Sequence, residues 1–292
     1  DGLRGVAAIT VVCFHIFEAF ATSHLDQNIN HGYLAVDFFF ILSGFVVGYA
    51  YDDRWGKMKT KDFIKRRTIR LHPMVVMGAI IGAIMFYIQG CSVWDVSVVP
   101  VTALLIATFL NMLLIPATTG NEIRGVGEMF PLNGPSWSLF FEYIGNILYA
   151  LFIHKLSTKA LATLVFITGC GLAAFATLGP LGDICVGFSL TGTEFTGGSL
   201  RLMFSFSAGL LLSRIFKPTN IKGAFWICSI IIVALLAVPR IGGAEHLWMN
   251  GIYDTLCCIL FFPILVYLGA SGKSTDKYTT RICNFLGDIS YP

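Results

Sequence analysis

Residues 32–50 read GYLAVDFFFILSGFVVGYA, a run in which Asp37 is the one charged side chain. A helix of about 20 apolar residues is long enough to cross the hydrocarbon core of a bilayer, which is about 30 Å thick. Backbone amides inside lipid must find their hydrogen bonds within the protein, and a helix provides them. The stretch therefore predicts a transmembrane helix.

The composition of the whole chain leads to the same class of protein. Of its 292 residues, 55% are hydrophobic and 13% are charged, whereas soluble domains carry about 25% charged residues. The apolar content also excludes a disordered chain. The net charge is +3, and no basic stripe of the kind that binds nucleic acid is present. The sequence indicates an integral membrane protein whose surroundings are the lipid bilayer.

We predict an all-α fold, a polytopic bundle of transmembrane helices. The candidate spans are 3–22, 32–50, 71–89, 98–116, 135–153, 160–178, 201–213, 223–239 and 251–269. A further apolar stretch begins near Phe285 and is cut off at Pro292, and the chain starts at Asp1 without a leader. We therefore expect one integral-membrane domain over 1–292, a fragment trimmed at both ends with its final helix truncated.

Basic residues indicate which loops face the cytoplasm. Segment 51–70 holds eight of the twenty Lys and Arg residues, and the positive-inside rule places it, together with the N-terminal end, in the cytoplasm. Smaller basic clusters lie around 154–159, 214–222 and 273–281. Two full crossings between 71 and 116 would put the 154–159 loop outside. We therefore favour a non-crossing or re-entrant segment within 90–134.

The first predicted helix contains three ionisable residues, Arg4, His15 and Glu18, and such groups are costly in lipid unless they are paired or hydrated. Arg4 and His15 are eleven residues apart, so they share one helix face and are separated by about 16 Å along the axis. Arg4 is then expected near the cytoplasmic headgroups and His15 near the middle of the bilayer. Glu18 follows His15 at i+3 and can reach it.

Two more helices carry charges at membrane depth. Asp37 stands beside three phenylalanines and must face a partner, while Gly44 and Gly48 form a small-xxx-small spacing that allows another helix to approach closely. Arg67 and Arg70 stand one turn apart at the cytoplasmic end of the third helix. Two guanidinium groups on one face can bind phosphate in a bidentate manner.

The fifth predicted helix begins with polar residues inside the membrane. Pro135 stands near the first helical position, where proline is favoured, and Ser136, Trp137 and Ser138 follow it. Ser138 is expected to face Glu142 at i+4. A buried acid at such a helix start is a candidate functional group.

Each of these features also has a structural interpretation. His15 and Glu18 could form a satisfied polar pair that holds helices together, and Asp37 and Glu142 could be counter-ions of buried arginines, a role compatible with catalysis. The two arginines of the third helix could be membrane anchors or lipid headgroup contacts.

Three residues of the loop after the first helix, His24, Asp26 and His31, raise the question of a metal site. Their spacing is not that of a set of metal ligands. We interpret them as part of a plain solvated loop and predict no metal site.

Taken together, these segments resemble the integral-membrane acyltransferase-3 family, whose members transfer acyl groups to sugars and other acceptors. The matching pieces are Asp1-Gly2-Leu3-Arg4-Gly5, the Arg4-x10-His15 spacing, Asp37-Phe38-Phe39 leading to Ser43-Gly44-Phe45, Arg67-x-x-Arg70 before Pro73, Ser136-Trp137-Ser138-Leu139-x-x-Glu142, and Leu286-Gly287-Asp288-Ile289-Ser290-Tyr291-Pro292. Each piece alone is a weak signal, but their order over essentially the whole chain is specific.

The resemblance implies a bundle of about ten helices, an acyl-coenzyme A donor taken from the cytoplasm, and an acceptor that is often an envelope polysaccharide. It also implies that His15 and Arg4 are essential and that Arg67 and Arg70 contribute.

We therefore predict a membrane O-acyltransferase of the bacterial inner membrane. It would move an acyl group, acetyl in the simplest case, from acyl-CoA to a hydroxyl of a carbohydrate or glycolipid, with acyl-CoA (acetyl-CoA) as co-substrate and no tightly bound cofactor. His15 would be the general base, because imidazole exchanges protons near neutral pH, and a carboxylate would orient it. The expected residues are His15, Glu18, Asp37 and Glu142 for catalysis, Arg4, Arg67 and Arg70 for the donor phosphates, and Ser136, Trp137 and Ser138 in support.

Two alternatives use the same residues differently. A polytopic transporter or exporter of a polar solute would use the buried charges as its substrate path. A purely structural membrane scaffold leaves those charges without a purpose. Whether His15 acts only as a base or briefly carries the acyl group stays open.

Overall fold

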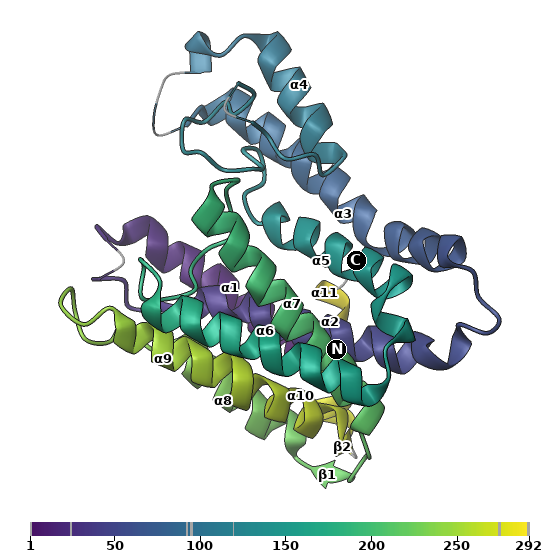
Figure 1. Cartoon of the computed structure of the whole chain (residues 1–292). Helices are drawn as coiled ribbons and strands as arrows, with labels where there is room; N and C mark the ends of the chain where they lie inside the picture. The colour runs from purple at the N-terminus through teal and green to yellow at the C-terminus, as the bar shows by residue number, and fades with distance from the viewer. Residues whose placement is uncertain are drawn as a thin grey trace. The chain divides into compact units, whose positions relative to one another are not determined.

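The computed structural model describes residues 2–23, 25–91, 93, 96–118, 120–273 and 276–290, and within these ranges the chain is almost entirely helical (Figure 1). The helices are α1 (Gly2–Phe20), α2 (Ala35–Tyr51), α3 (Thr60–Gln89), α4 (Val101–Met112), α5 (Ser136–Leu151), α6 (Thr158–Leu178), α7 (Gly192–Ile215), α8 (Ala224–Leu236), α9 (Trp248–Leu256), α10 (Phe262–Ala270) and α11 (Lys277–Ile289). Two short strands, β1 (Ile221–Lys222) and β2 (Gly272–Lys273), pair in parallel. The predicted all-α class is confirmed, and each predicted span contains a helix.

The structure also confirms an integral membrane protein. Six helical stretches in the described part of the chain are long and apolar enough to cross a bilayer: Gly2–Phe20, His31–Arg54, Thr60–Gln89, Thr158–Leu178, Gly192–Ile215 and Trp248–Ala270. The last of these joins α9 and α10 through a π-helical turn, Cys257–Phe261.

By its internal contacts the chain divides into two compact units. Unit 1 comprises 1–56, 155–185 and 200–291, and unit 2 comprises 57–154 and 186–199. The family resemblance extends over both units, and the expectation of one domain stays a prediction.

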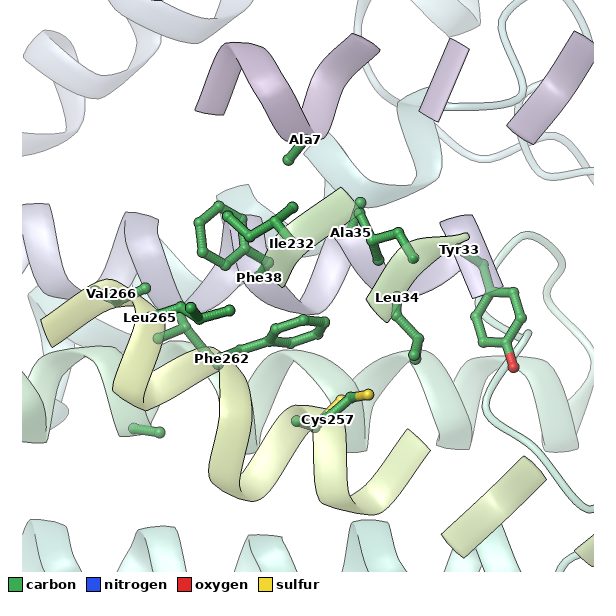
Figure 2. Packing of buried hydrophobic residues seen from close by; sticks show 14 of the residues in the cluster. Ala7, Tyr33, Leu34, Ala35, Phe38, Ile232, Cys257, Phe262, Leu265 and Val266 are labelled. Carbon is green, nitrogen blue, oxygen red and sulfur yellow. The ribbon is translucent and has the colours of Figure 1, made fainter. Parts of the chain in front are cut away.

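The core of unit 1 is built from apolar side chains of α1, α2, α8 and α10, with the short 3-10 turn His31–Leu34 at one end. Figure 2 shows Phe38, Phe262, Leu265 and Val266 gathered between these helices. The Phe38 and Phe262 rings meet edge to face, with centroids 5.8 Å apart. Burial of aromatic pairs in this geometry stabilises the packing beyond the area it removes from solvent.

Glycines set the distance between α2 and α7 within unit 1. A Cβ atom on Gly44 would collide with the backbone oxygen of Phe206, and one on Gly209 would collide with the backbone oxygen of Ile41. A Cβ atom on the neighbouring Gly48 would collide with the side-chain hydroxyl of Ser213. The predicted small-xxx-small contact is therefore present, and α7 is the helix that it admits.

In unit 2, α3 is longer than predicted, because it begins at Thr60 instead of near residue 71. Its first turns carry basic residues, which are good helix formers but lower the hydropathy of the sequence there. Thirty helical residues extend for about 45 Å, more than the bilayer core needs. The second half of α3 packs against α4, with Phe86, Leu104 and Ala107 in one apolar cluster.

The short helix α4 lies in the segment that the basic loops indicate as non-crossing. Its 12 residues extend for about 18 Å, too little to cross a core of about 30 Å. The chain after α4 returns to the middle of α3, where Leu132 and Asn133 lie against Gly82 and Gly78. This geometry is compatible with the re-entrant segment expected within 90–134, which stays a prediction.

The 13-residue helix α8 is also short, but its flanking residues connect both ends of unit 1. At one end Ile221 pairs with Gly272 just beyond α10. At the other end the carbonyl of Val238 accepts a hydrogen bond from His31 at the start of the second span. The 221–238 segment therefore extends over the full depth of unit 1.

Candidate active site

The turn of α1 around His15 has the geometry of an oriented base. The Nδ1 atom of His15 lies 2.8 Å from Oε2 of Glu18, and a carboxylate only accepts hydrogen bonds, so Nδ1 carries the proton. The lone pair of the neutral ring is then on Nε2. The two side chains are 51% and 44% exposed, which leaves the ring open to a reactant. The pair lies in the C-terminal half of α1, with His15 four residues, or about 6 Å, past the helix middle.

Neighbouring residues fix the backbone of this turn. The side-chain amide of Gln27, which is buried, donates hydrogen bonds to the carbonyl oxygens of Phe14 (3.1 Å) and Ile29 (2.8 Å). Gly32 packs directly against the Phe14 side chain, and the Phe14 ring meets the His15 ring edge to face. Gln27 was not among the predicted site residues, because a lone glutamine in a loop gives no signal in the sequence.

Asp26 closes the loop that follows α1. It accepts hydrogen bonds from the hydroxyl of Thr22 (2.6 Å) and from the amide of Ser23 (2.7 Å). These hydrogen bonds, the one from the Thr22 side chain first, hold the pKa of Asp26 well below its usual range. The loop is therefore tied to the end of α1 by a carboxylate that stays charged at neutral pH.

Arg4 lies on the same helix as His15, eleven residues nearer the N-terminus. The helix is continuous between them, so the predicted axial separation of about 16 Å holds. Arg4 is partly buried.

Asp37 is bound by an arginine that was not among the predicted site residues. Arg201 of α7 donates to Asp37 through Nη2 (2.7 Å) and Nε (3.1 Å), and also donates to the carbonyl of Tyr33 (2.8 Å). Both charged side chains are almost completely buried. This arrangement matches the counter-ion interpretation of Asp37. Asp37 was predicted because an ionisable group within an apolar span marks a candidate functional site. The same rule, applied to the span 201–213, also indicates Arg201.

In unit 2, Glu142 of α5 forms an ion pair with Arg67 of α3, with 2.9 Å between Oε1 and Nη2. Arg67 is buried, and its Nε has no hydrogen-bond partner among the described residues. Arg70 lies one turn further along α3 and is partly buried. One turn beyond Arg67 in the same helix pair, the His72 ring lies 3.4 Å from the Tyr143 hydroxyl.

The start of α5 is well packed. Ser136 is buried, and the ring of Trp137 lies against Gly187, which has a φ of 120°. The hydroxyl of Ser138 donates to the carbonyl of Pro135 at 2.9 Å, so this hydrogen bond goes to the backbone and not to Glu142 as the i+4 spacing suggests. These residues hold the polar start of the helix in place.

A second buried polar cluster lies in unit 1 where α2 begins. Asp254 of α9 accepts hydrogen bonds from the Tyr33 hydroxyl (3.0 Å) and from the Ile184 amide (3.0 Å). Its Oδ1 lies 3.8 Å from Nε2 of His31, and Nδ1 of His31 donates to the carbonyl of Val238 (2.8 Å). Asp254 lies within the predicted span 251–269, so the rule for charges in apolar spans would also have indicated it.

The interpretation of His31 as part of a solvated loop is wrong, because its side chain is fully buried. The Tyr253 ring, the Val238 carbonyl and Asp254 lie against it, and all three come from parts of the chain far away in sequence. Asp26 is exposed as expected, and His24 lies outside the described residues. Among the described residues, no group of three His, Cys, Asp or Glu side chains could hold a metal ion.

The fold and these sites define an integral-membrane protein with an open histidine–carboxylate pair. A family model described as an acyltransferase domain matches residues 1–292, and the chain therefore belongs to the acyltransferase-3 family. It is an enzyme that transfers acyl groups, and this finding favours the predicted transferase over the transporter and the scaffold.

Individual relatives agree with the family. The chain is 34% identical over 158 residues to "Protein 2 in picA locus" of Rhizobium radiobacter, covering 51% of this chain and 78% of the relative. It is 29% identical over 185 residues to "Acyltransferase MdmB" of Streptomyces mycarofaciens, covering 59% and 43%. A "Putative O-acetyltransferase" of Staphylococcus aureus (strain COL) is 35% identical over 81 residues, covering 26% and 12%. The chain thus spans less than half the length of the last two relatives. No solved structure matches it.

Proposed function

We propose that the protein transfers an acyl group, acetyl in the simplest case, from acyl-CoA to a hydroxyl of a carbohydrate or glycolipid of the cell envelope. The observation that carries this proposal is the His15–Glu18 pair, which is hydrogen bonded at 2.8 Å and open on its other side. Relatives with acyltransferase and O-acetyltransferase names support the choice of an oxygen acceptor and of a short acyl group.

In the proposed reaction His15 acts first as a base and then as an acid. Its Nε2 takes the proton of the acceptor hydroxyl while the hydroxyl oxygen attacks the carbonyl carbon of the thioester. The carbon–oxygen bond forms, the carbon–sulfur bond breaks, and the leaving thiolate takes the proton from the imidazolium. Glu18 holds the ring by its Nδ1–H and stabilises the imidazolium while it exists.

The arginines provide a binding role for the donor. Guanidinium groups bind phosphate strongly and with defined geometry, and we assign Arg4, Arg67 and Arg70 to the phosphates of coenzyme A on the cytoplasmic side. The ion pair with Glu142 fixes the orientation of Arg67, and Ser136, Trp137 and Ser138 hold the start of α5. In this proposal Asp37 supports the site from within the core through Arg201.

The expected orientation in the membrane also fits a donor that enters from the cytoplasm and an acceptor that approaches from the other side. The donor is a cytoplasmic metabolite, and His15 lies in the half of α1 away from the cytoplasmic end. A thioester on a slender arm can therefore enter from within, while an envelope glycan approaches from outside. We accordingly place the protein in the bacterial inner membrane, with the positive-inside rule giving its orientation.

The test is an assay of membranes that contain the enzyme, labelled acetyl-CoA and a crude envelope glycan fraction. Substitution His15→Ala is expected to lower acyl transfer by a factor on the order of 10² to 10⁴, the usual contribution of a general base. His246→Ala is the matched control, because His246 is an exposed histidine of an outer loop and its loss should leave the rate unchanged.

A second variant separates catalysis from folding. Glu18→Gln keeps the shape of the side chain but removes its charge, so the rate should fall at saturating acetyl-CoA while KM for the donor changes little. Transfer by His15→Ala at the wild-type rate would remove His15 from the mechanism. If the acyl group reaches the acceptor from a donor other than acetyl-CoA, and no coenzyme A thiol is released, the assignment of the donor is wrong. The role of His15 would not be affected by that result.

A further inference from the structure

Unit 1 contains a cavity that the proposed reaction does not use. Its volume is about 530 Å³, within the range of small-molecule binding sites. Apolar side chains of α2, α8 and α10 form its walls, among them Phe38, Phe45, Phe225 and Val266. The cavity touches α1 at Gly2 and Leu3, twelve residues from His15, or about 18 Å along the helix.

The polar part of the cavity lining, here called the mouth, contains one basic and one acidic side chain. Lys273, Asp276, Thr279 and Asn284 line it, and Lys273 is paired in register with Lys222 across β1 and β2. Paired residues of parallel strands stand about 4.8 Å apart and point to the same face. Two lysine side chains that extend from such positions carry ammonium groups that repel each other. An anion bound between the two ammonium groups offsets this repulsion.

Among the described residues that line the cavity, the one carboxylate has another role. Asp276 is the N-cap of α11 and accepts a hydrogen bond from the amide of Thr279 at 2.7 Å. The backbone hydrogen bond from Thr279 lowers the pKa of Asp276. Its negative charge is thus directed to the first turn of α11, whose free amides it compensates, and the lysines still make the mouth attractive to an anion.

The surroundings of the mouth fit the surface of a membrane. On α11 the exposed side chains of Tyr278, Ile282, Phe285 and Ile289 recur at helical spacing and form one apolar stripe. An adjoining face of α11 packs on α1, where Gly5 lies against Leu286. A helix with one apolar face left open beside basic residues is typical of the membrane interface.

The orientation of the chain identifies the leaflet. The β1–β2 pair joins the basic loops 214–222 and 273–281, which face the cytoplasm by the positive-inside rule. The cytoplasmic leaflet carries anionic lipids, and basic pockets between transmembrane helices on this side bind their headgroups.

We propose that the cavity binds an anionic phospholipid of the inner leaflet. One acyl chain occupies the apolar cavity between α2, α8 and α10, and the phosphate lies between Lys222 and Lys273. The wall and the mouth thus match the two halves of one amphiphilic ligand, and the site is separate from the His15–Glu18 pair.

The experiment measures lipid retention by the full chain in a mild detergent. Native mass spectrometry compares palmitoyl-oleoyl phosphatidylglycerol with the phosphatidylcholine of the same chains. Wild-type protein should retain phosphatidylglycerol preferentially. Each basic residue near a membrane surface contributes enough binding free energy for about a fivefold effect, so Lys222→Gln combined with Lys273→Gln should weaken retention roughly 30-fold.

Two further variants complete the test. Lys159→Gln with Lys217→Gln removes the same charge from exposed lysines of the same membrane side that do not line the cavity, and it should leave retention unchanged. Val46→Phe fills the apolar wall without changing charge and should weaken binding of the phospholipid.

Three outcomes would overturn the proposal. They are equal retention of both lipids by wild-type protein, equal losses in the two double-lysine variants, and displacement of phosphatidylglycerol by coenzyme A or inorganic phosphate. Displacement of this kind would assign the lysines to a soluble phosphate ligand.

Discussion

At the scale of single residues, charges inside the membrane are held by partners from distant parts of the sequence. Arg201 donates three hydrogen bonds to Asp37, and the two side chains are 1% and 0% exposed. Removing one partner of such a pair leaves the other charge buried and uncompensated, which costs more than the pair contributes. The Asp37–Arg201 pair is therefore a point where a single substitution should act on folding.

We expect Arg201→Ala to destabilise the protein by about 3–5 kcal/mol, because Asp37 would lose its counter-ion in the core. The measurement is the midpoint of thermal unfolding in detergent, with Arg281→Ala as control, since Arg281 is an exposed arginine of α11. Equal midpoints for the two variants would show that Asp37 finds another partner.

The sequence was informative about the candidate site wherever the relation is local. His15 and Glu18 are three residues apart, so helix geometry alone places them together. The partners of Asp37 and His31 could not be predicted in this way, because Arg201 and Asp254 are more than 160 residues further along the chain. Their positions depend on which helices pack together, and periodicity in one sequence does not determine that.

At the scale of helices, close packing of α2 on α7 depends on glycine. Hydropathy predicts both helices, and the Gly44–Gly48 spacing predicts that some helix approaches. Only the structure shows that the approaching helix is α7 and that its Gly209 lies against Ile41. The length of α3 was underestimated for a different reason, because a hydropathy window ends where the lipid ends, whereas the helix continues into water.

We expect Gly44→Ala to lower stability by about 1–3 kcal/mol, the usual cost of adding a methyl group to a packed interface. The new Cβ would meet the backbone of Phe206, which cannot move aside without shifting α7. Gly56→Ala is the matched control, because a Cβ at Gly56 meets nothing within 4 Å. Both variants are compared by thermal unfolding in detergent, and identical midpoints would mean that the two helices separate at little cost.

At the scale of the whole molecule, the distribution of charge is explained once α4 is re-entrant. With α4 inserted but not crossing, the loops outside the cytoplasm carry two basic residues, Arg124 and Arg240. Each of these is in an ion pair, Arg124 with Glu128 and Arg240 with Asp183. The basic loops at 51–70, 154–159, 214–222 and 273–281 then all face the cytoplasm, as the positive-inside rule requires.

This topology predicts the side of the membrane on which three loops are found. In a background without native cysteines, Val98→Cys and Asn121→Cys flank α4, and Lys57→Cys lies in the basic segment; all three positions are exposed. A maleimide that cannot cross membranes should label the first two in intact spheroplasts, because in the re-entrant arrangement both ends of α4 lie on the side away from the cytoplasm. Lys57→Cys should react only after lysis. If Asn121→Cys were protected until lysis while Val98→Cys was labelled, α4 would cross the membrane, and the cytoplasmic location of the later basic loops, on which the lipid site depends, would be lost.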